Sequence, residues 1–293
     1  MDFGPYLLLA TMEGAVGAAV LALTALGLSL VFGVMRIVNV AHGAFFMLGA
    51  IVAWWVADTL NAGPALNFLA ALVISPLAVG AVAISAERSV LRRLNYNPES
   101  TIVATIGLLY VIEQVALMTF GPDARPVVAP LDFRVQLPWF GYSGYKLLVI
   151  GASIVLMLVV WWGLTRTRIG LMMRATQFDR ETARAFAIPV DRVYGGVFAF
   201  GAMLAAIGAV LVVPIQQAHY LMGNDPLLLS FIVVIIGGLG SLRGTVLAAV
   251  IIGLSDGIIS VFFSPTLAKI IATLIVAMIL VIRPKGLFGT QSA

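Results

Sequence analysis

The chain has no cysteine, only two histidines and only three lysines. Without cysteine, disulfide frameworks, thiolate metal sites and cysteine nucleophiles are excluded. His42 and His219 are far apart, and neither has a second histidine or an acid four positions away, the spacing of a helical metal site. No lysine lies in the phosphate-binding loop of ATPases, and the serine elbow of hydrolases is absent. We therefore expect no enzymatic activity, no ATPase site and no cofactor or metal bound by this chain.

Charged residues are also scarce. They make up 10% of the 293 residues, whereas hydrophobic residues make up 61%, and soluble domains carry about 25% charged residues. A helix needs about 20 apolar residues to cross the roughly 30 Å hydrocarbon core of a membrane. Such stretches fill most of the chain. The net charge of +4 is small and the basic residues flank apolar segments, so we expect no nucleic-acid partner.

Charged or turn-rich breaks separate nine apolar segments. They cover residues 13–33, 39–57, 66–86, 101–120, 146–164, 193–214, 227–242, 244–262 and 267–283. No lysine or arginine precedes the first segment, so we interpret it as a membrane helix and not as a signal peptide. Residues 34–38 and 240–244 are short connections, which suggests broken or re-entrant segments. The sequence thus predicts an all-α, polytopic transmembrane helix bundle of about 8–9 segments, with residues 1–293 as a single domain.

Lysine and arginine are strongly biased to one side of this topology. If the N-terminus is outside, the inner side holds 13 of the 17 basic residues: Arg36, Arg88, Arg92, Arg93, Arg166, Arg168, Arg174, Arg180, Arg184, Arg192, Arg243, Arg283 and Lys285. The outer side keeps Arg125, Arg134, Lys146 and Lys269. Because short cytoplasmic loops are enriched in basic residues, we expect the N-terminus outside and the C-terminus inside.

The outer loop, at about residues 121–145, is rich in proline. It contains Pro122, Pro126, Pro130 and Pro138. Proline removes a backbone donor and favours extended neighbours, so this loop should be ordered but mostly non-helical.

The inner loop, at about residues 165–192, has helical periodicity. Small or apolar side chains recur at steps of three and four: Leu171, Ala175, Phe178, Thr182 and Ala185. Asp179 is placed to cap a helix that starts at Arg180, and Pro189 to stop it. The pattern predicts a short amphipathic helix on the cytoplasmic face. Such a helix can hold lipid phosphates or dock a soluble partner, and both roles stay open.

Polar residues within membrane segments are costly, so they are candidates for a translocation path. Asn39 and His42 begin the second segment, Glu113 and Gln114 lie within the fourth, and Asp256 lies in the eighth. A buried structural role is equally open for the two acids. It is favoured for His42, which has no acid within one helical turn.

The glycine cluster Gly237, Gly238 and Gly240 lies at the end of the seventh segment. Clustered glycines in an apolar segment indicate a broken helix, whose freed backbone groups could bind a polar solute near the midplane.

Four sequence elements, which follow one another along the chain, also carry a family resemblance. They are residues 27–43 with Asn39-Val40-Ala41-His42-Gly43, residues 168–188, residues 236–244 and residues 283–289. With these elements the chain resembles the LivH-type permease subunits of branched-chain amino acid ABC importers. The resemblance identifies an ATPase-coupling segment that contains Gly170, Arg174, Ala175, Asp179, Glu181, Ala183, Arg184 and Ile188. Ala187 and Arg243 depart from it, since the family often has glycine and proline there.

The resemblance implies a membrane-spanning permease subunit of an ATP-driven importer for branched-chain amino acids or similar small solutes, in the bacterial inner membrane. It implies as partners a second LivH/LivM-type permease subunit, two cytoplasmic ATPase subunits that use ATP and Mg, and a periplasmic solute-binding protein, besides membrane lipid. The outer loop is then a candidate contact for the binding protein. Two alternatives stay open: an ion-coupled secondary transporter that uses Glu113 or Asp256, and a structural membrane subunit without an ATPase.

Overall fold

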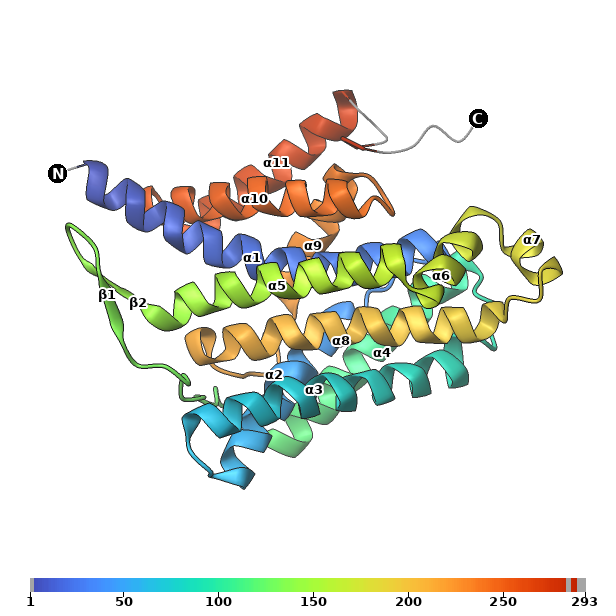
Figure 1. Ribbon diagram of the computed structural model, residues 1–293, viewed down its shortest axis with the longest axis horizontal. Helices are drawn as coiled ribbons and strands as arrows, with labels where there is room; N and C mark the ends of the chain where they lie inside the picture. The colour runs from blue at the N-terminus through green and yellow to red at the C-terminus, as the bar shows by residue number, and fades with distance from the viewer. Residues whose placement is uncertain (1–2, 283–285, 289–293) are drawn as a thin grey trace.

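The computed structural model describes residues 3–282 and 286–288, which form a bundle of helices (Figure 1). Its elements are α1 (Phe3–Met35), α2 (His42–Leu60), α3 (Pro64–Ala86), the π-helical turn η1 (Glu87–Leu91), α4 (Pro98–Phe120), β1 (Arg134–Gln136), β2 (Gly141–Ser143), α5 (Gly144–Arg166), α6 (Arg168–Phe178), α7 (Arg180–Ala185), α8 (Val190–Gln216), α9 (Asn224–Gly237), α10 (Leu242–Phe262) and α11 (Pro265–Ile282). The predicted helix bundle is confirmed, and the loop predicted to lie outside contains the small antiparallel hairpin β1–β2.

Each of the nine predicted membrane segments corresponds to a helix. Seven helical stretches of the described residues are long and apolar enough to span a membrane: α1, α2, α3 with η1, α4, α5, α8 and α10. With 14 residues, α9 is roughly 21 Å long, less than the roughly 30 Å of the hydrocarbon core. The chain is therefore a multi-pass membrane protein, while the exact number of spans and the orientation of its termini stay predictions.

Both predicted short connections interrupt the helices. The first helix ends at Met35, and Arg36 takes a left-handed φ of 55° before the chain enters α2. The second interruption follows α9, where Gly238 (φ 99°) and Gly240 (φ 79°) turn the chain into α10. Arg243 lies in the first turn of α10. A helix tolerates proline at this position, so both arginine and proline are compatible with the turn.

Helix α1 is the centre of the bundle. It is buried over most of its length and packs against α8 and α10. Small residues allow this close approach, since a Cβ atom on Gly27 would overlap the carbonyl oxygen of Gly201 in α8, and one on Gly253 in α10 would overlap Ala18. By contrast, α4 and α5 leave large apolar side chains exposed, among them Val103, Tyr110, Met118, Leu158 and Trp162.

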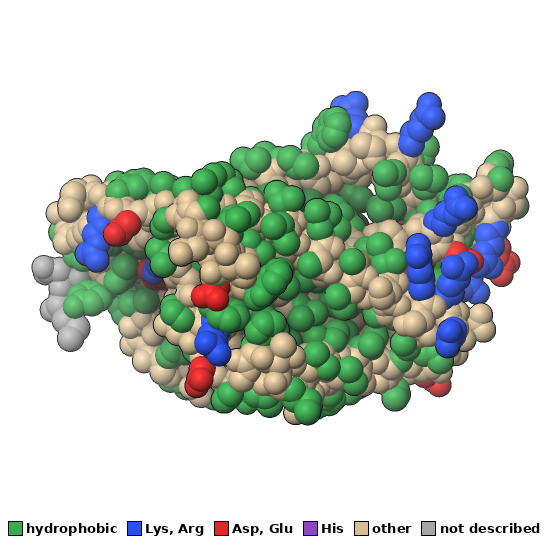
Figure 2. Space-filling view, turned by 90° about the horizontal axis from the view of Figure 1, so that it is seen from below, with side chains coloured by type: hydrophobic (Ala, Val, Ile, Leu, Met, Phe, Trp, Pro, Cys, Tyr) green, Lys and Arg blue, Asp and Glu red, His purple; other side chains and the backbone are tan. Residues whose placement is uncertain are grey.

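The two ends of the bundle differ in charge. Figure 2 shows lysine and arginine gathered at one end, where α6 and α7 lie in Figure 1. We call this the basic end, and the opposite end, with β1 and β2, the hairpin end. Two predicted inner basic residues, Arg283 and Lys285, lie outside the described residues, as do Pro284 and Gly289 of the predicted tail element.

Candidate coupling face and membrane-embedded polar sites

The predicted amphipathic segment at the basic end is two short helices, α6 and α7. Thr167 caps α6, where its hydroxyl accepts a hydrogen bond from the Gly170 amide at 3.1 Å. Asp179 caps α7 and accepts from the amides of Glu181 at 2.8 Å and Thr182 at 3.2 Å. The predicted cap at Asp179 is confirmed. The hydrogen bond from the Thr182 hydroxyl and those from the two amides hold the pKa of Asp179 below its usual range.

Gly170 and Arg174 fix α6 to the end of α5. A Cβ atom on Gly170 would overlap the carbonyl oxygen of Leu164, and the guanidinium of Arg174 donates to that same oxygen. Both residues therefore set the angle between the two helices. Ala175 lies half-buried on α6.

Ala183 and Ile188 close the end of α7. The Ile188 amide donates to the carbonyl oxygen of Ala183 at 3.0 Å, the Ala187 amide donates to that of Arg184 at 2.9 Å, and the Ala183 side chain is buried. Between them Ala187 has a φ of 60°. This left-handed conformation closes helices most easily with glycine, so the departure from glycine at this position has a conformational cost.

The predicted apolar stripe is not the face that α6 and α7 bury. The buried residues are Gly170, Met173, Thr176 and Ala183, whereas Leu171, Thr182 and Ala185 are exposed. Phe178 and Phe186, at the two ends of α7, are 88% and 78% exposed. The expectation was wrong because α6 packs its small and medium side chains on α1, α5 and α8 and leaves its one aromatic side chain, Phe178, outside. Glu181 and Arg184 also point to solvent.

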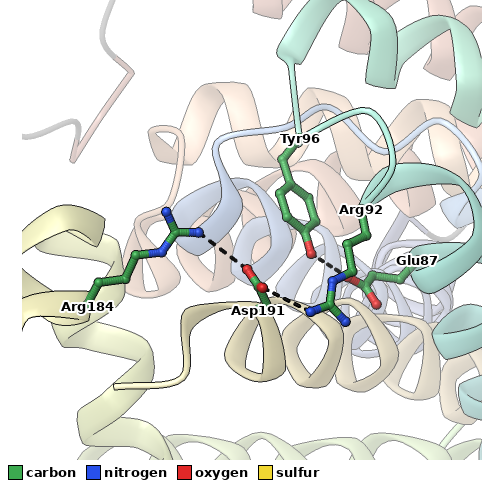
Figure 3. A network of polar contacts seen from close by, with 5 residues as sticks. All are labelled: Glu87, Arg92, Tyr96, Arg184 and Asp191. Atoms are coloured by element: carbon green, nitrogen blue, oxygen red, sulfur yellow. Dashed lines mark hydrogen bonds and ion pairs between the residues drawn. The ribbon is translucent and has the colours of Figure 1, made fainter. Parts of the chain in front are cut away.

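The sequence patterns did not predict a polar network that lies at the basic end (Figure 3). Asp191, in the first turn of α8, binds Arg92 at 3.0 Å and Arg184 of α7 at 3.4 Å. Next to them Tyr96 donates to Glu87 at 2.5 Å, and Glu87 is 2% exposed. Burial and this hydrogen bond raise the pKa of Tyr96. The network joins α7 to α8 and η1. In the sequence, its only signal is that the acidic residue Glu87 lies at the end of an apolar segment.

Asn39 and His42 lie inside the bundle. Both are fully buried, and His42 Nε2 donates to the carbonyl oxygen of Thr24 in α1 at 2.9 Å. Thr105 of α4 holds the connection before α2, since its hydroxyl accepts from the Val40 amide at 3.2 Å. The side-chain amide of Asn39 and Nδ1 of His42 have no hydrogen-bond partner among the described residues.

The polar pair on α4 faces two ways. Glu113 is buried where α4 packs on α2, and its Oε1 has no partner within the described part of the chain. Gln114, the next residue, is exposed. The structure therefore does not bring these two neighbours together in one site.

The glycine cluster breaks the chain at the basic end and not midway along the bundle. Gly240 lies against Gly33 at the end of α1, and the Gln177 side chain of α6 is close by. The carbonyl oxygens of Ile236 and Gly237 accept from the amides of Leu287 at 2.8 Å and Phe288 at 3.2 Å. The backbone carbonyl groups freed at the end of α9 therefore already accept hydrogen bonds from other residues of the chain.

Asp256 lies at the hairpin end, on α10, in the wall of a cavity of about 560 Å³. Glu13, Asp225 and Lys269 line the same cavity. Glu113 is not among the residues that line this cavity, so Glu113 and Asp256 do not share one site.

Seven helical stretches of the described residues are long and apolar enough to span a membrane, which defines a multi-pass membrane protein, and two capped helices, α6 and α7, lie at its basic end. The chain belongs to the family of permease components of the branched-chain amino acid transport system, whose profile matches residues 10–282. It is thus a permease component of a transport system, which works with other subunits, and not an enzyme.

Curated relatives resemble the chain over nearly its whole length. It is 26% identical to the high-affinity branched-chain amino acid transport system permease protein BraD of Pseudomonas aeruginosa, over 92% of this chain and 91% of the relative. It is 26% identical to the permease protein LivH of Escherichia coli strain K12, over 97% and 96%. A probable LivH of Methanocaldococcus jannaschii is 27% identical over 96% and 92%. No solved structure matches the chain significantly.

Proposed function

We propose that the chain is the membrane-spanning permease subunit of an ATP-driven importer that translocates branched-chain amino acids or similar small solutes. The family and the full-length similarity to high-affinity branched-chain amino acid permeases support this function. The comparisons give no support to the alternative of an ion-coupled secondary transporter. Membership of a transport-system family also disfavours a purely structural subunit.

The observation that carries the proposal is the exposed pair Phe178 and Phe186 on either side of α7. A large aromatic side chain gains roughly 25 cal/mol per Å² when a partner buries it, so each of these two exposed rings would stabilise a complex that covers it. Arg180, Glu181 and Arg184 lie between them. A short helix with aromatic ends and a charged middle suits a groove on a cytoplasmic ATPase subunit.

The rest of the complex follows from the same function. Two ATPase subunits would bind ATP and Mg, a second LivH/LivM-type permease or lipid would cover the exposed apolar faces of α4 and α5, and a periplasmic binding protein would deliver the solute near the loop at about residues 121–145. The similarity to a bacterial LivH permease supports the bacterial inner membrane, and the bias of basic residues supports an N-terminus outside and a C-terminus inside.

In the proposed mechanism, ATP-driven closure of the ATPase subunits moves α6 and α7 as a unit. Arg174 transmits this movement to α5 through Leu164, and Arg184 transmits it to α8 and η1 through Asp191. The helices around α1 then alternate between outward and inward access.

Co-purification tests the docking surface. The double variant Phe178→Ala/Phe186→Ala should insert normally and lose its ATPase subunits. Phe263→Ala is the matched control, because Phe263 is 73% exposed at the far end of α10. Retention of the ATPase by the double variant, or equal loss in the control, would contradict the proposed docking surface.

A further inference from the structure

The cavity that Asp256 lines lies between residues of α1, α2, α8, α9, α10 and α11. One wall is apolar, with Val16, Val20, Phe46, Val212, Ile215 and Leu229. The other wall carries Glu13, Asp225, Asp256 and Lys269. Its volume of about 560 Å³ is within the roughly 300–1,000 Å³ typical of small-molecule sites.

Three of the four charged groups are already paired. Lys146 donates to both carboxylate oxygens of Glu13, at 2.6 and 2.8 Å, and Lys269 donates to Asp225 at 2.7 Å. Asp256 is half-buried and makes no hydrogen bond or ion pair with any residue that the structure describes. A carboxylate inside a membrane helix is costly unless a cation or donor compensates it. Asp256 is therefore the one carboxylate of this cavity that has no bonded partner among the described residues, and Lys269 acts on it only at longer range.

Lys269 can contribute to the same ligand. Its ammonium has three N–H donors, and the structure gives it one carboxylate partner, Asp225. A second, anionic acceptor can bind it without displacing that partner. An unpaired carboxylate, a lysine with spare donors and an apolar wall then line a single cavity, which is the complement of a zwitterion with an aliphatic side chain.

We propose that this cavity binds an α-amino acid with an aliphatic side chain. Asp256 binds the ammonium group, Lys269 binds the carboxylate, and the apolar wall holds the side chain. This inference rests on the proposed function, because it places the transported solute within the permease itself.

The packing of α1 next to the cavity would stop a bound solute from moving further through the bundle. Thr24 of α1 lines the cavity, and its carbonyl oxygen is bonded to His42. One helical turn further along α1, Gly27 is in backbone contact with Gly201 of α8. A solute that enters from the hairpin end meets closed helix packing at this depth and can pass only after α1 and α8 separate.

The test is equilibrium binding of radiolabelled L-leucine to the full-length chain with its co-purifying permease and ATPase subunits, in lipid nanodiscs and without binding protein. Asp256→Asn should weaken binding by about tenfold or more, since it removes a charge-assisted hydrogen bond, whereas Asp256→Glu should restore it. Asp58→Asn is the matched control, because Asp58 is an exposed acid at the hairpin end outside this cavity.

Two leucine analogues separate recognition of the zwitterion from simple apolar or cation binding. Isoamylamine lacks the carboxylate and isocaproate lacks the ammonium, so both should compete poorly with leucine. Equal affinity of the wild type and Asp256→Asn, or equal competition by all three ligands, overturns the inference.

A parallel uptake assay, with binding protein and ATP, keeps this inference separate from the proposed function. If the wild-type complex takes up leucine and yet binds none in nanodiscs, the cavity site is wrong and the function stands. If no amino acid is taken up with ATP, the proposed function itself fails.

Discussion

Arg92 and Asp191 form an ion pair at 3.0 Å that joins the end of η1 to the start of α8. Asp191 also binds Arg184 at 3.4 Å, so one carboxylate connects the exposed helix α7 to two helices of the bundle (Figure 3). All three side chains are partly exposed, and exposed pairs contribute only about 0–1 kcal/mol to stability. These ion pairs should therefore affect the coupling of solute uptake to ATP hydrolysis more than the free energy of unfolding.

Asp191→Asn should leave the unfolding free energy within about 1 kcal/mol of the wild type. Solute uptake per ATP hydrolysed should fall by about twofold to thirtyfold, the range of coupling energies of roughly 0.5–2 kcal/mol. Uptake and ATP hydrolysis in proteoliposomes measure this ratio. Arg93→Gln is the control, because Arg93 is exposed beside Arg92 and is absent from the network. An unchanged ratio in Asp191→Asn would rule out the coupling role of the carboxylate.

Gly170→Ala should displace α6 from α5. The added methyl group meets the backbone of Leu164, which cannot move aside as a side chain can, so we expect a loss of roughly 1–3 kcal/mol and weaker co-purification of the ATPase. Gly163→Ala is the control in the same helical pair, since a Cβ there meets nothing within 4 Å. Thermal unfolding compares the two, and similar midpoints would contradict the packing described for Gly170.

Ala187→Gly should stabilise the end of α7. A left-handed non-glycine residue costs about 1–2 kcal/mol, and Ala187 has a φ of 60°. Hydrogen exchange of the Ile188 amide, which donates to Ala183, should become slower. Ala185→Gly, inside α7, should make the same amide exchange faster. Faster exchange in Ala187→Gly would show that the strain is absent.

The cap at Asp179 should depend on pH in a defined direction. Its pKa is lower in the folded protein than in the unfolded chain, so its stabilising effect is complete above the unfolded value of about 3.9 and is lost as the pH falls through the lower folded value. The protection of the Glu181 and Thr182 amides, measured against their intrinsic exchange rates, should stay constant at mildly acidic pH and fall as the pH drops from about 3.9 through the folded pKa of Asp179. Thr182→Val, which removes the largest cause of the shift, should move this loss of protection to higher pH; no such movement would contradict the hydroxyl's role.

Local patterns were enough to predict the membrane segments, the cap at Asp179 and the interruption at Gly238 and Gly240. Each depends on properties of neighbouring residues: hydropathy over about 20 positions, a side chain that reaches the next amides, and backbone freedom at glycine.

Contacts between residues far apart in the chain could not be predicted from these local patterns. The stripe through Leu171 and Phe178 is apolar, but the buried face of α6 is decided by the close approach of Gly170 to Leu164 in another helix. In the same way, adjacent positions on α4 bury Glu113 and expose Gln114, and the Glu87–Tyr96 contact depends on a turn whose path no periodicity encodes.

Uptake of radiolabelled leucine by proteoliposomes tests the central claim most directly. The vesicles contain the co-purified complex, with the solute-binding protein outside and ATP with Mg inside. We predict uptake that requires both ATP and the binding protein, and that is lost in Phe178→Ala/Phe186→Ala but kept in Phe263→Ala. Uptake driven by a proton or sodium gradient with no ATPase subunit present would contradict the account.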